Sequence, residues 1–135
     1  MANKKINFEK EKPVTKYIDL FYMTPAEIKA KDIAELLNDE KDIKLELWDE
    51  MNILELELRN QNSVDFEPVD IHFKNASDAA FIKNRNINTI FAVNVNETDL
   101  DQVKSLFEKV IGQYSGFLCS DTEDFNPVYV GSLSK

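Results

Sequence analysis

The sequence has little of what most catalytic and metal sites require. Its 135 residues include one cysteine, one histidine and three glycines. A single cysteine excludes an internal disulfide, and one cysteine with one histidine cannot make a structural zinc site. The three glycines, Gly112, Gly116 and Gly131, form no glycine-rich loop of the kind that cradles phosphate groups. This inventory predicts a protein that is not an enzyme and holds no metal and no cofactor.

Long apolar segments are also missing. No apolar run approaches the roughly 20 residues that cross a bilayer as a helix. The opening residues Met1-Ala2-Asn3-Lys4-Lys5 have no apolar stretch behind their lysines, unlike a secretory signal. These features predict a cytoplasmic protein.

Acidic residues dominate the charge, and they are unevenly distributed. The net charge is −9, but residues 1–16 hold five lysines and two glutamates, so the rest of the chain carries −12. An acidic body repels phosphate backbones and anionic lipids, which argues against nucleic acids and membranes as partners. It favours a basic protein partner, because opposite charges steer association. The simpler alternative is that the acidity only keeps the protein soluble.

The composition is that of one folded domain. With 43% hydrophobic residues, a chain of this length can bury about two-thirds of the surface that it exposes when unfolded. Residues 1–13 are polar, lysine-rich and closed by Pro13. We therefore expect a flexible lead-in over residues 1–13 and a single domain over residues 14–135.

Two segments carry the signals of capped helices. In the first, Thr24 as the cap, Pro25 in the first turn and Glu27 completing a capping box predict a helix that ends near Asn38. The second begins at residues 98–101, where acidic residues suit the positive end of a helix, and ends at Gly112 or Gly116. A weaker helical signal covers residues 77–85.

Strict alternation of apolar and polar residues marks two neighbouring strands. Residues 43–48 and 54–59 each alternate leucine or isoleucine with residues that are all charged except Trp48, and a short polar turn joins them. This pattern predicts an antiparallel hairpin with one dry and one wet face. Further strands are expected at residues 16–23, 69–74, 89–95, 117–119 and 127–130, with residues 89–95 central in the sheet and residues 60–63 forming a loop.

The order of these elements predicts an α+β fold. We expect a mainly antiparallel sheet with the two capped helices on one face, a variant of the ferredoxin-like βαββαβ arrangement with extra strands. Two strand–helix–strand units, at residues 16–48 and 87–120, suggest an internal duplication.

The chemically reactive residues form no obvious constellation. Cys119 lies in an apolar run and His72 on the polar side of its expected strand, so we interpret both as structural and not as a catalytic dyad. The acidic cluster Asp121, Glu123 and Asp124 offers oxygen ligands, but it has neither the glycine nor the distal glutamate of a calcium loop.

The face of the sheet without helices is the candidate binding surface. Trp48 is a large aromatic residue among charges there, and aromatic residues in polar surroundings are frequent hot spots. The alternative is that Trp48 packs beneath the loop at residues 60–68 or the N-terminal segment. The predicted partner-binding residues are Glu46, Trp48, Glu55, Glu57, Asp121, Glu123, Asp124, Phe125 and Tyr129.

The leading hypothesis is a small acidic binding protein that masks or inhibits a basic partner. In size, acidity and α+β make-up the chain resembles bacterial immunity proteins, and this resemblance implies an inhibitor of a toxin such as a nuclease. One alternative is a self-associating regulatory or assembly module that forms a homodimer through the hairpin or the strand at residues 127–130. Another is a small enzyme that uses carboxylates.

Overall fold

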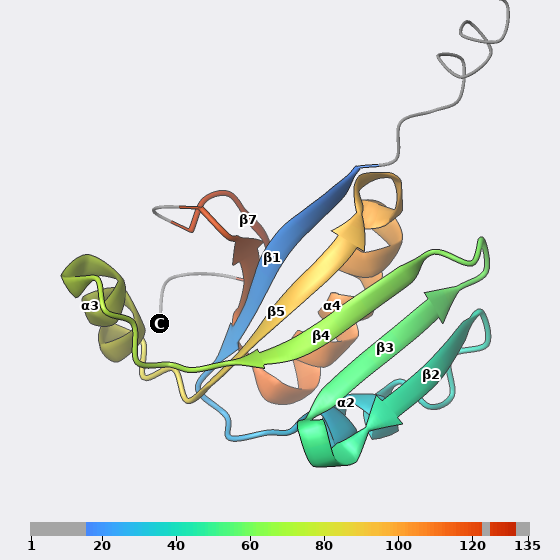
Figure 1. The fold of residues 1–135 in the computed structure, drawn as a ribbon, viewed down its shortest axis with the longest axis horizontal. Helices are drawn as coiled ribbons and strands as arrows, with labels where there is room; N and C mark the ends of the chain where they lie inside the picture. The colour runs from blue at the N-terminus through green and yellow to red at the C-terminus, as the bar shows by residue number, and fades with distance from the viewer. Residues whose placement is uncertain (1–15, 123–124, 132–135) are drawn as a thin grey trace, which may run out of the picture.

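A seven-stranded antiparallel sheet organises the described part of the chain, residues 16–122 and 125–131 of a computed structural model (Figure 1). The strands lie in the order β2-β3-β4-β5-β1-β6-β7. Their bounds are β1 Tyr17–Thr24, β2 Ile43–Trp48, β3 Ile53–Leu58, β4 Ser63–Val69, β5 Thr89–Asn96, β6 Phe117–Ser120 and β7 Val128–Gly131. The helices are α2 Ala30–Leu36, α3 Ala76–Asn84 and α4 Leu100–Tyr114, with 3-10 turns η1 Asp49–Met51 and η2 Glu97–Asp99.

The predicted α+β class, with its antiparallel sheet and extra strands, is confirmed. Strand β5 lies in the centre of the sheet, as its apolar sequence predicts. In the unit β5-α4-β6, strand β1 lies between β5 and β6 and pairs antiparallel with both. The unit that starts β1-α2-β2 is different, because three strands separate β1 from β2. The ferredoxin-like detail and the internal duplication are therefore unconfirmed.

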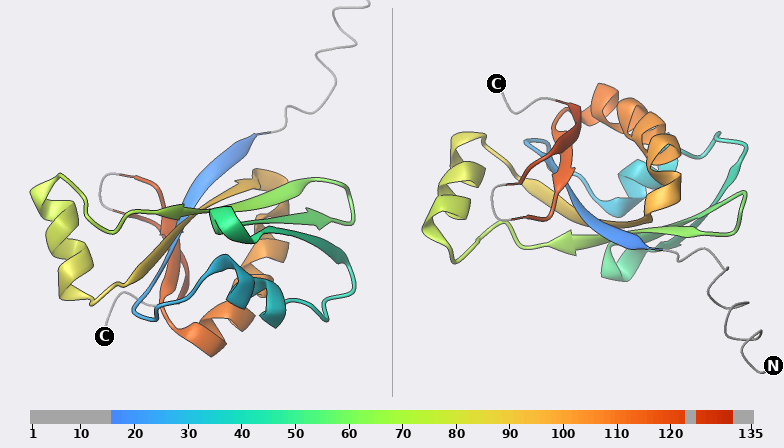
Figure 2. Two further views of the ribbon diagram at one scale, coloured as in Figure 1. Left: turned by 60° about the horizontal axis from the view of Figure 1, so that its bottom comes forward. Right: turned by 90° about the horizontal axis from the view of Figure 1, so that it is seen from above.

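Helices α2 and α4 cover one face of the sheet and enclose the main core (Figure 2). Alternate residues of every strand from β1 to β6 point into this core, together with one side of each helix. At its centre Phe66 of β4 stacks on Phe107 of α4, with ring centroids 5.5 Å apart. The hairpin β2–β3 contributes its apolar side as predicted, and Leu54, Leu56 and Leu58 are buried.

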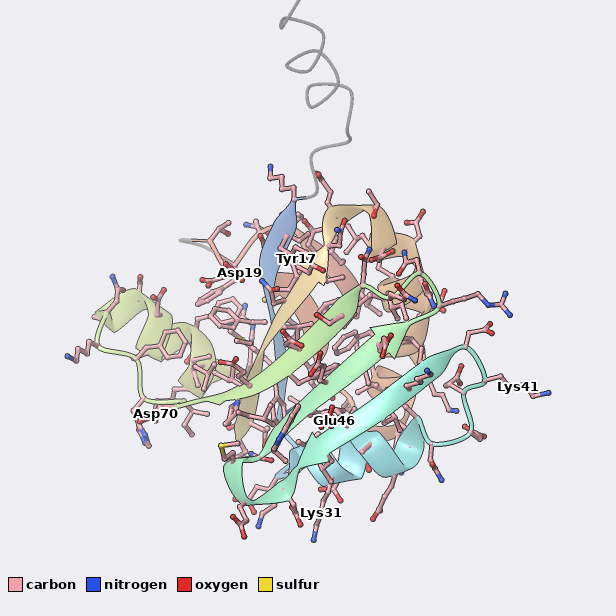
Figure 3. The ribbon with its side chains drawn as sticks, turned by 45° about the vertical axis from the view of Figure 1, so that its right-hand side comes forward. Tyr17, Asp19, Lys31, Lys41, Glu46 and Asp70 are labelled. Carbon is pink, nitrogen blue, oxygen red and sulfur yellow. The ribbon has the colours of Figure 1, made fainter. Side chains whose placement is uncertain are left out.

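A second, smaller core lies on the opposite face of the sheet. Phe21 and Met23 of β1 point away from α4 and pack with Ile82 of α3. Helix α3, predicted only weakly from its sequence, thus covers one end of the face that we expected to be open. The part of this face over β2, β3 and β4 carries polar residues and remains accessible (Figure 3).

Helix α2 begins later than its sequence predicts. The Thr24 hydroxyl donates to the Tyr114 carbonyl oxygen at 2.6 Å, and this tie holds the end of β1 against the end of α4. Residues 25–29 then run as a loop beside Thr89, and the helix starts only at Ala30. A residue far away in the sequence accepts a hydrogen bond from its first turn, because the Ala30 amide donates to Asn52 Oδ1 in the β2–β3 turn.

The strand expected at residues 69–74 is wrong, because the strand here is β4, Ser63–Val69. The chain leaves the sheet at Asp70, whose carboxylate accepts a hydrogen bond from the His72 amide at 2.9 Å and bends the backbone.

The loop between β3 and β4 is fixed by Asp99, a buried carboxylate that accepts hydrogen bonds from the side chains of Asn60 and Asn62. Within the described residues no helix is long and apolar enough to cross a membrane.

Candidate binding face

Acidic side chains form a row across the strands on the open face. Cross-strand pairing places Glu46 of β2 beside Glu55 of β3, Glu55 beside Asp65 of β4, and Asp65 beside Asn94 of β5. Asn94 in turn pairs with Asp19 of β1. We call this set the acidic row: Glu46, Glu55, Asp65, Asn94, Asp19 and Asp121.

Asp121 joins the row at the end of β6. Its backbone amide donates to the Asp19 carbonyl oxygen at 3.1 Å, which places the two residues next to each other. With neighbouring strands about 4.8 Å apart, six positions extend over about 24 Å. The only neutral member, Asn94, donates from Nδ2 to Asp19 Oδ1 at 2.8 Å.

The pKa values of three carboxyls in the row are raised. For Asp65 the main cause is burial, and Glu67 adds repulsion. Burial also raises the pKa of Glu55, and the largest repulsion on this carboxyl comes from Asp65. The pKa of Asp121 is raised by burial and by Asp19. The row therefore holds negative charges that disfavour one another.

These carboxylates have no cationic partner within the part of the chain that the structure describes. The ion pairs there join Arg59 to Asp42, Lys109 to Asp39 and Glu40, and His72 to Asp70. The contrast with Asp39 is direct, because Lys109 lowers the pKa of that carboxyl. The acidic row is thus an anionic surface that no ion pair of the described residues neutralises.

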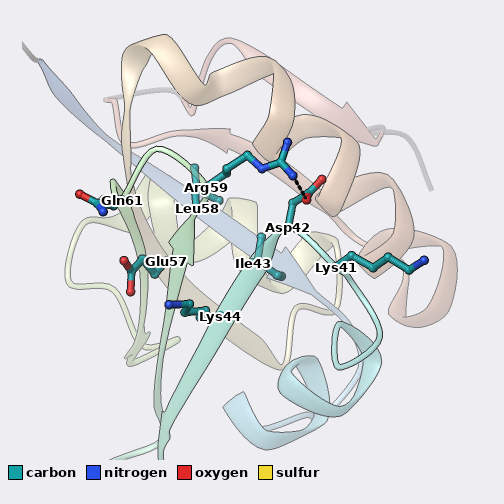
Figure 4. A pocket seen from close by; sticks show the side chains of 8 residues that line it. All are labelled: Lys41, Asp42, Ile43, Lys44, Glu57, Leu58, Arg59 and Gln61. Atoms are coloured by element: carbon teal, nitrogen blue, oxygen red, sulfur yellow. Dashed lines mark ion pairs between the residues drawn. The ribbon is translucent and has the colours of Figure 1, made fainter.

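The predicted partner-binding residues are only partly brought together. Glu46, Glu55 and Asp121 belong to the acidic row, and Glu57 lies on the same face beside Lys44 (Figure 4). Trp48 lies at the turn end of β2 and is 37% exposed. Glu123 and Asp124 lie outside the described residues.

Of the two aromatic residues predicted to bind a partner near the C-terminus, Phe125 is buried, and its prediction is wrong. Phe125 is 2% exposed, and its ring lies 4.6 Å from that of Phe81, so it belongs to the second core and not to the surface. Tyr129 is half-buried and packs against the main core on the helix side of the sheet. An aromatic residue in a polar loop can fill a core, and sequence alone does not separate that case from an exposed anchor.

Asp19 and Asp65 were missed by the sequence analysis. The alternation Val64-Asp65-Phe66-Glu67 was the available signal for a strand with acidic residues on one face. Their place beside Glu55 depends on strand order, which the sequence does not specify. The pairing register across β3, β4, β5 and β1 brings together residues that are far apart in the chain.

Asp65→Asn is expected to raise the thermal unfolding midpoint by about 2 °C at neutral pH. The folded pKa of Asp65 lies above its unfolded value, so ionisation destabilises the fold above the folded pKa. This penalty disappears as the pH falls through the folded pKa and below the unfolded one. Melting curves followed by circular dichroism should therefore show the gain at pH about 7 and none at pH about 3.

Asp39→Asn is the matched control, with the opposite sign. Lys109 lowers the pKa of Asp39, so the ionised form stabilises the fold at neutral pH and the variant should melt earlier than the wild type. Equal melting temperatures for Asp65→Asn and the wild type at pH about 7 would contradict the prediction that the ionised Asp65 carboxylate destabilises the fold.

The hollows and reactive residues elsewhere lack this concentration of one charge. A hollow of about 260 Å³ at the end of the β2–β3 hairpin is lined by charges of both signs, including the Arg59–Asp42 ion pair at 3.3 Å (Figure 4). Cys119 is buried in the second core, and burial raises the pKa of its thiol to about 12. His72 is exposed in the loop after β4. Among the described residues no group of His, Cys, Asp and Glu side chains is arranged to hold a metal ion.

Comparison of the chain with models of known protein families, with characterised proteins and with solved structures finds no match.

Proposed function

We propose that this chain is a small acidic binding protein that neutralises a basic protein partner, and that the partner lies across the acidic row. One observation carries the proposal. The row holds carboxyls whose pKa values are raised by burial and by one another, and no cation of the described residues pairs with them. Lysine and arginine side chains of the partner supply the missing positive charges.

The geometry suits a masking role. The row lies on a sheet held by a core on each face, so its side chains are positioned before the partner arrives. Preorganised charge reduces the cost of ordering on binding, and a net charge of −9 accelerates the encounter with a cationic surface. An inhibitor of the immunity-protein type, which covers the cationic site of a toxin such as a nuclease, works in this way.

The test uses the full chain as bait in lysate of its native host, washed at low and then high salt. The row variant is Glu55→Gln with Asp65→Asn and Asp121→Asn, which removes the three carboxyls of raised pKa and should therefore fold at least as well as the wild type. We expect the wild type to retain one basic protein at low salt. The row variant should bind the recovered protein about 100-fold more weakly.

The matched control removes the same amount of charge elsewhere. Glu27→Gln, Glu35→Gln and Glu108→Gln lie at exposed positions around α2 and α4, and this variant should bind like the wild type. Equal weakening by the row and control variants would show that only net charge acts. Retention of no basic protein by the wild type at low salt would overturn the proposed function.

A further inference from the structure

Strand β2 forms a regular, open edge of the sheet. Its six residues pair with β3 over their whole length, and within the described ranges no strand lies on its other side (Figure 1). The opposite edge is different, because β7 has four residues and its register with β6 shifts at Leu118 and Cys119. Short or irregular edges resist pairing with another chain, whereas long regular edges favour it. The edge available for pairing is therefore β2.

Exposed apolar side chains gather at this edge. Of the four large hydrophobic residues that are exposed among the described residues, Leu47, Trp48 and Met51 lie on β2 or in the turn that follows it. Ile43 and Leu45, on the helix side of β2, are only half-buried. The helix side of the edge strand thus offers an apolar strip of three residues, Ile43, Leu45 and Leu47, to a further strand.

The sequence of β2 is complementary to itself in one antiparallel register. With a two-fold axis through Leu45, Ile43 lies opposite Leu47 of the second copy, and Leu45 lies opposite Leu45 of the second copy. On the open face, Lys44 lies opposite Glu46 of the second copy, and Glu46 opposite its Lys44. Directly opposite residues have Cβ atoms about 5 Å apart, within reach of an ion pair.

The neighbouring registers lack this complementarity. An axis through Lys44 places two lysines opposite each other and sets Asp42 against Glu46 of the second copy. An axis through Glu46 places two glutamates opposite each other. Like charges directly opposite destabilise a sheet, so the charges on β2 select the register centred on Leu45.

We propose that the partner of the β2 edge is a second copy of this chain, joined by antiparallel pairing of β2 with β2 in the register centred on Leu45. Backbone hydrogen bonds between the edges provide the pairing. The strip Ile43, Leu45 and Leu47 is buried between the copies, and two Lys44–Glu46 ion pairs fix the register. The two sheets become one sheet of 14 strands with both open faces on the same side.

This inference does not rest on the proposed function, and the two can fail separately. The row variant leaves Lys44 and Glu46 unchanged, so it should lose the basic partner and keep the association of copies. Variants at Lys44 and Glu46 should change the association of copies and leave the other carboxyls of the acidic row in place.

The test is analytical ultracentrifugation of the full chain at about 1 to 500 µM in about 150 mM salt. The wild type should shift from a monomer of 15.6 kDa to twice that mass as concentration rises. Lys44→Glu places two glutamate pairs in the interface and Glu46→Lys places two lysine pairs there, so each should weaken association about tenfold or more. The double variant Lys44→Glu with Glu46→Lys reverses both pairs and should restore association.

Two controls complete the design. Lys83→Glu on α3 and Glu108→Lys on α4 make the same charge changes at exposed positions outside β2 and should leave association unchanged. Melting curves show that each variant is folded, and emission from Trp48, the only tryptophan, provides a second measure of pairing. A wild-type mass that stays at 15.6 kDa up to about 500 µM would overturn the proposal. A double variant that associates no better than the single variants would overturn the register.

Discussion

Gly116→Ala is expected to lower the free energy of unfolding by about 3 kcal/mol or more, a large fraction of the roughly 5–15 kcal/mol that stabilises a typical domain. Gly116 has a φ of 94°, a conformation that side chains rarely adopt. A Cβ atom there would lie 2.1 Å from the Met23 carbonyl oxygen, which is backbone and cannot move aside without distorting β1. Chemical denaturation followed by circular dichroism measures the loss.

Gly112→Ala is the matched substitution with the opposite sign. Gly112 lies within α4, and a Cβ atom there would meet nothing within 4 Å. Alanine in a helix interior is favoured over glycine by about 0.5–1 kcal/mol, so this variant should be more stable than the wild type. If both variants changed stability by the same small amount, the close approach of Gly116 to β1 would be wrong.

Phe66→Ala is expected to cost about 3–5 kcal/mol of stability. Phe66 is buried between the sheet and α4, stacked on Phe107 and 6.3 Å edge-on from Phe91. Alanine would leave a cavity at the centre of the main core. Phe66 lies between Asp65 and Glu67 in β4. Its loss also weakens the packing that anchors β4, the strand that carries Asp65 in the middle of the acidic row.

Phe66→Leu separates the cavity from the loss of aromatic stacking. Leucine fills most of the space, so this variant should lose about 1.5 kcal/mol or less. Urea denaturation of both variants, with the midpoint and the slope reported, checks the order. A loss of less than about 1 kcal/mol for Phe66→Ala would contradict the central position of Phe66.

The parts of the fold with strong local signals were predictable. The hairpin β2–β3 follows from strict alternation, and α4 follows from its buried stripe and its acidic start. The start of α2 was not predictable, because the Thr24 hydroxyl bonds to Tyr114 and the first turn of the helix is completed by Asn52. Distant residues thus override a sequence that has the local pattern of a cap.

The candidate site was predictable in composition but not in arrangement. Alternation correctly assigned Glu46, Glu55 and Glu57 to the face of the hairpin opposite the helices. Asp19 joins them only because β5 and β4 lie between β1 and β3 in the sheet. Strand order is a property of the whole chain, so neither the acidic row nor its raised pKa values could be read from the spacing of residues.

The position of β1 also determines when the fold can be completed. The first strand of the sheet pairs with β5 and β6, and the Tyr22 hydroxyl donates to the carbonyl of Ser115, 93 positions away. During synthesis from the N-terminus, β2, β3 and β4 emerge and can pair while β1 still has no neighbour. Contacts between residues so far apart in the chain slow folding. Until they form, an unpaired apolar strand can associate with an incorrect strand or with another chain. The nascent chain therefore carries the apolar residues 20–23 of β1 without a partner strand until β5, the fifth of the seven strands, has been made.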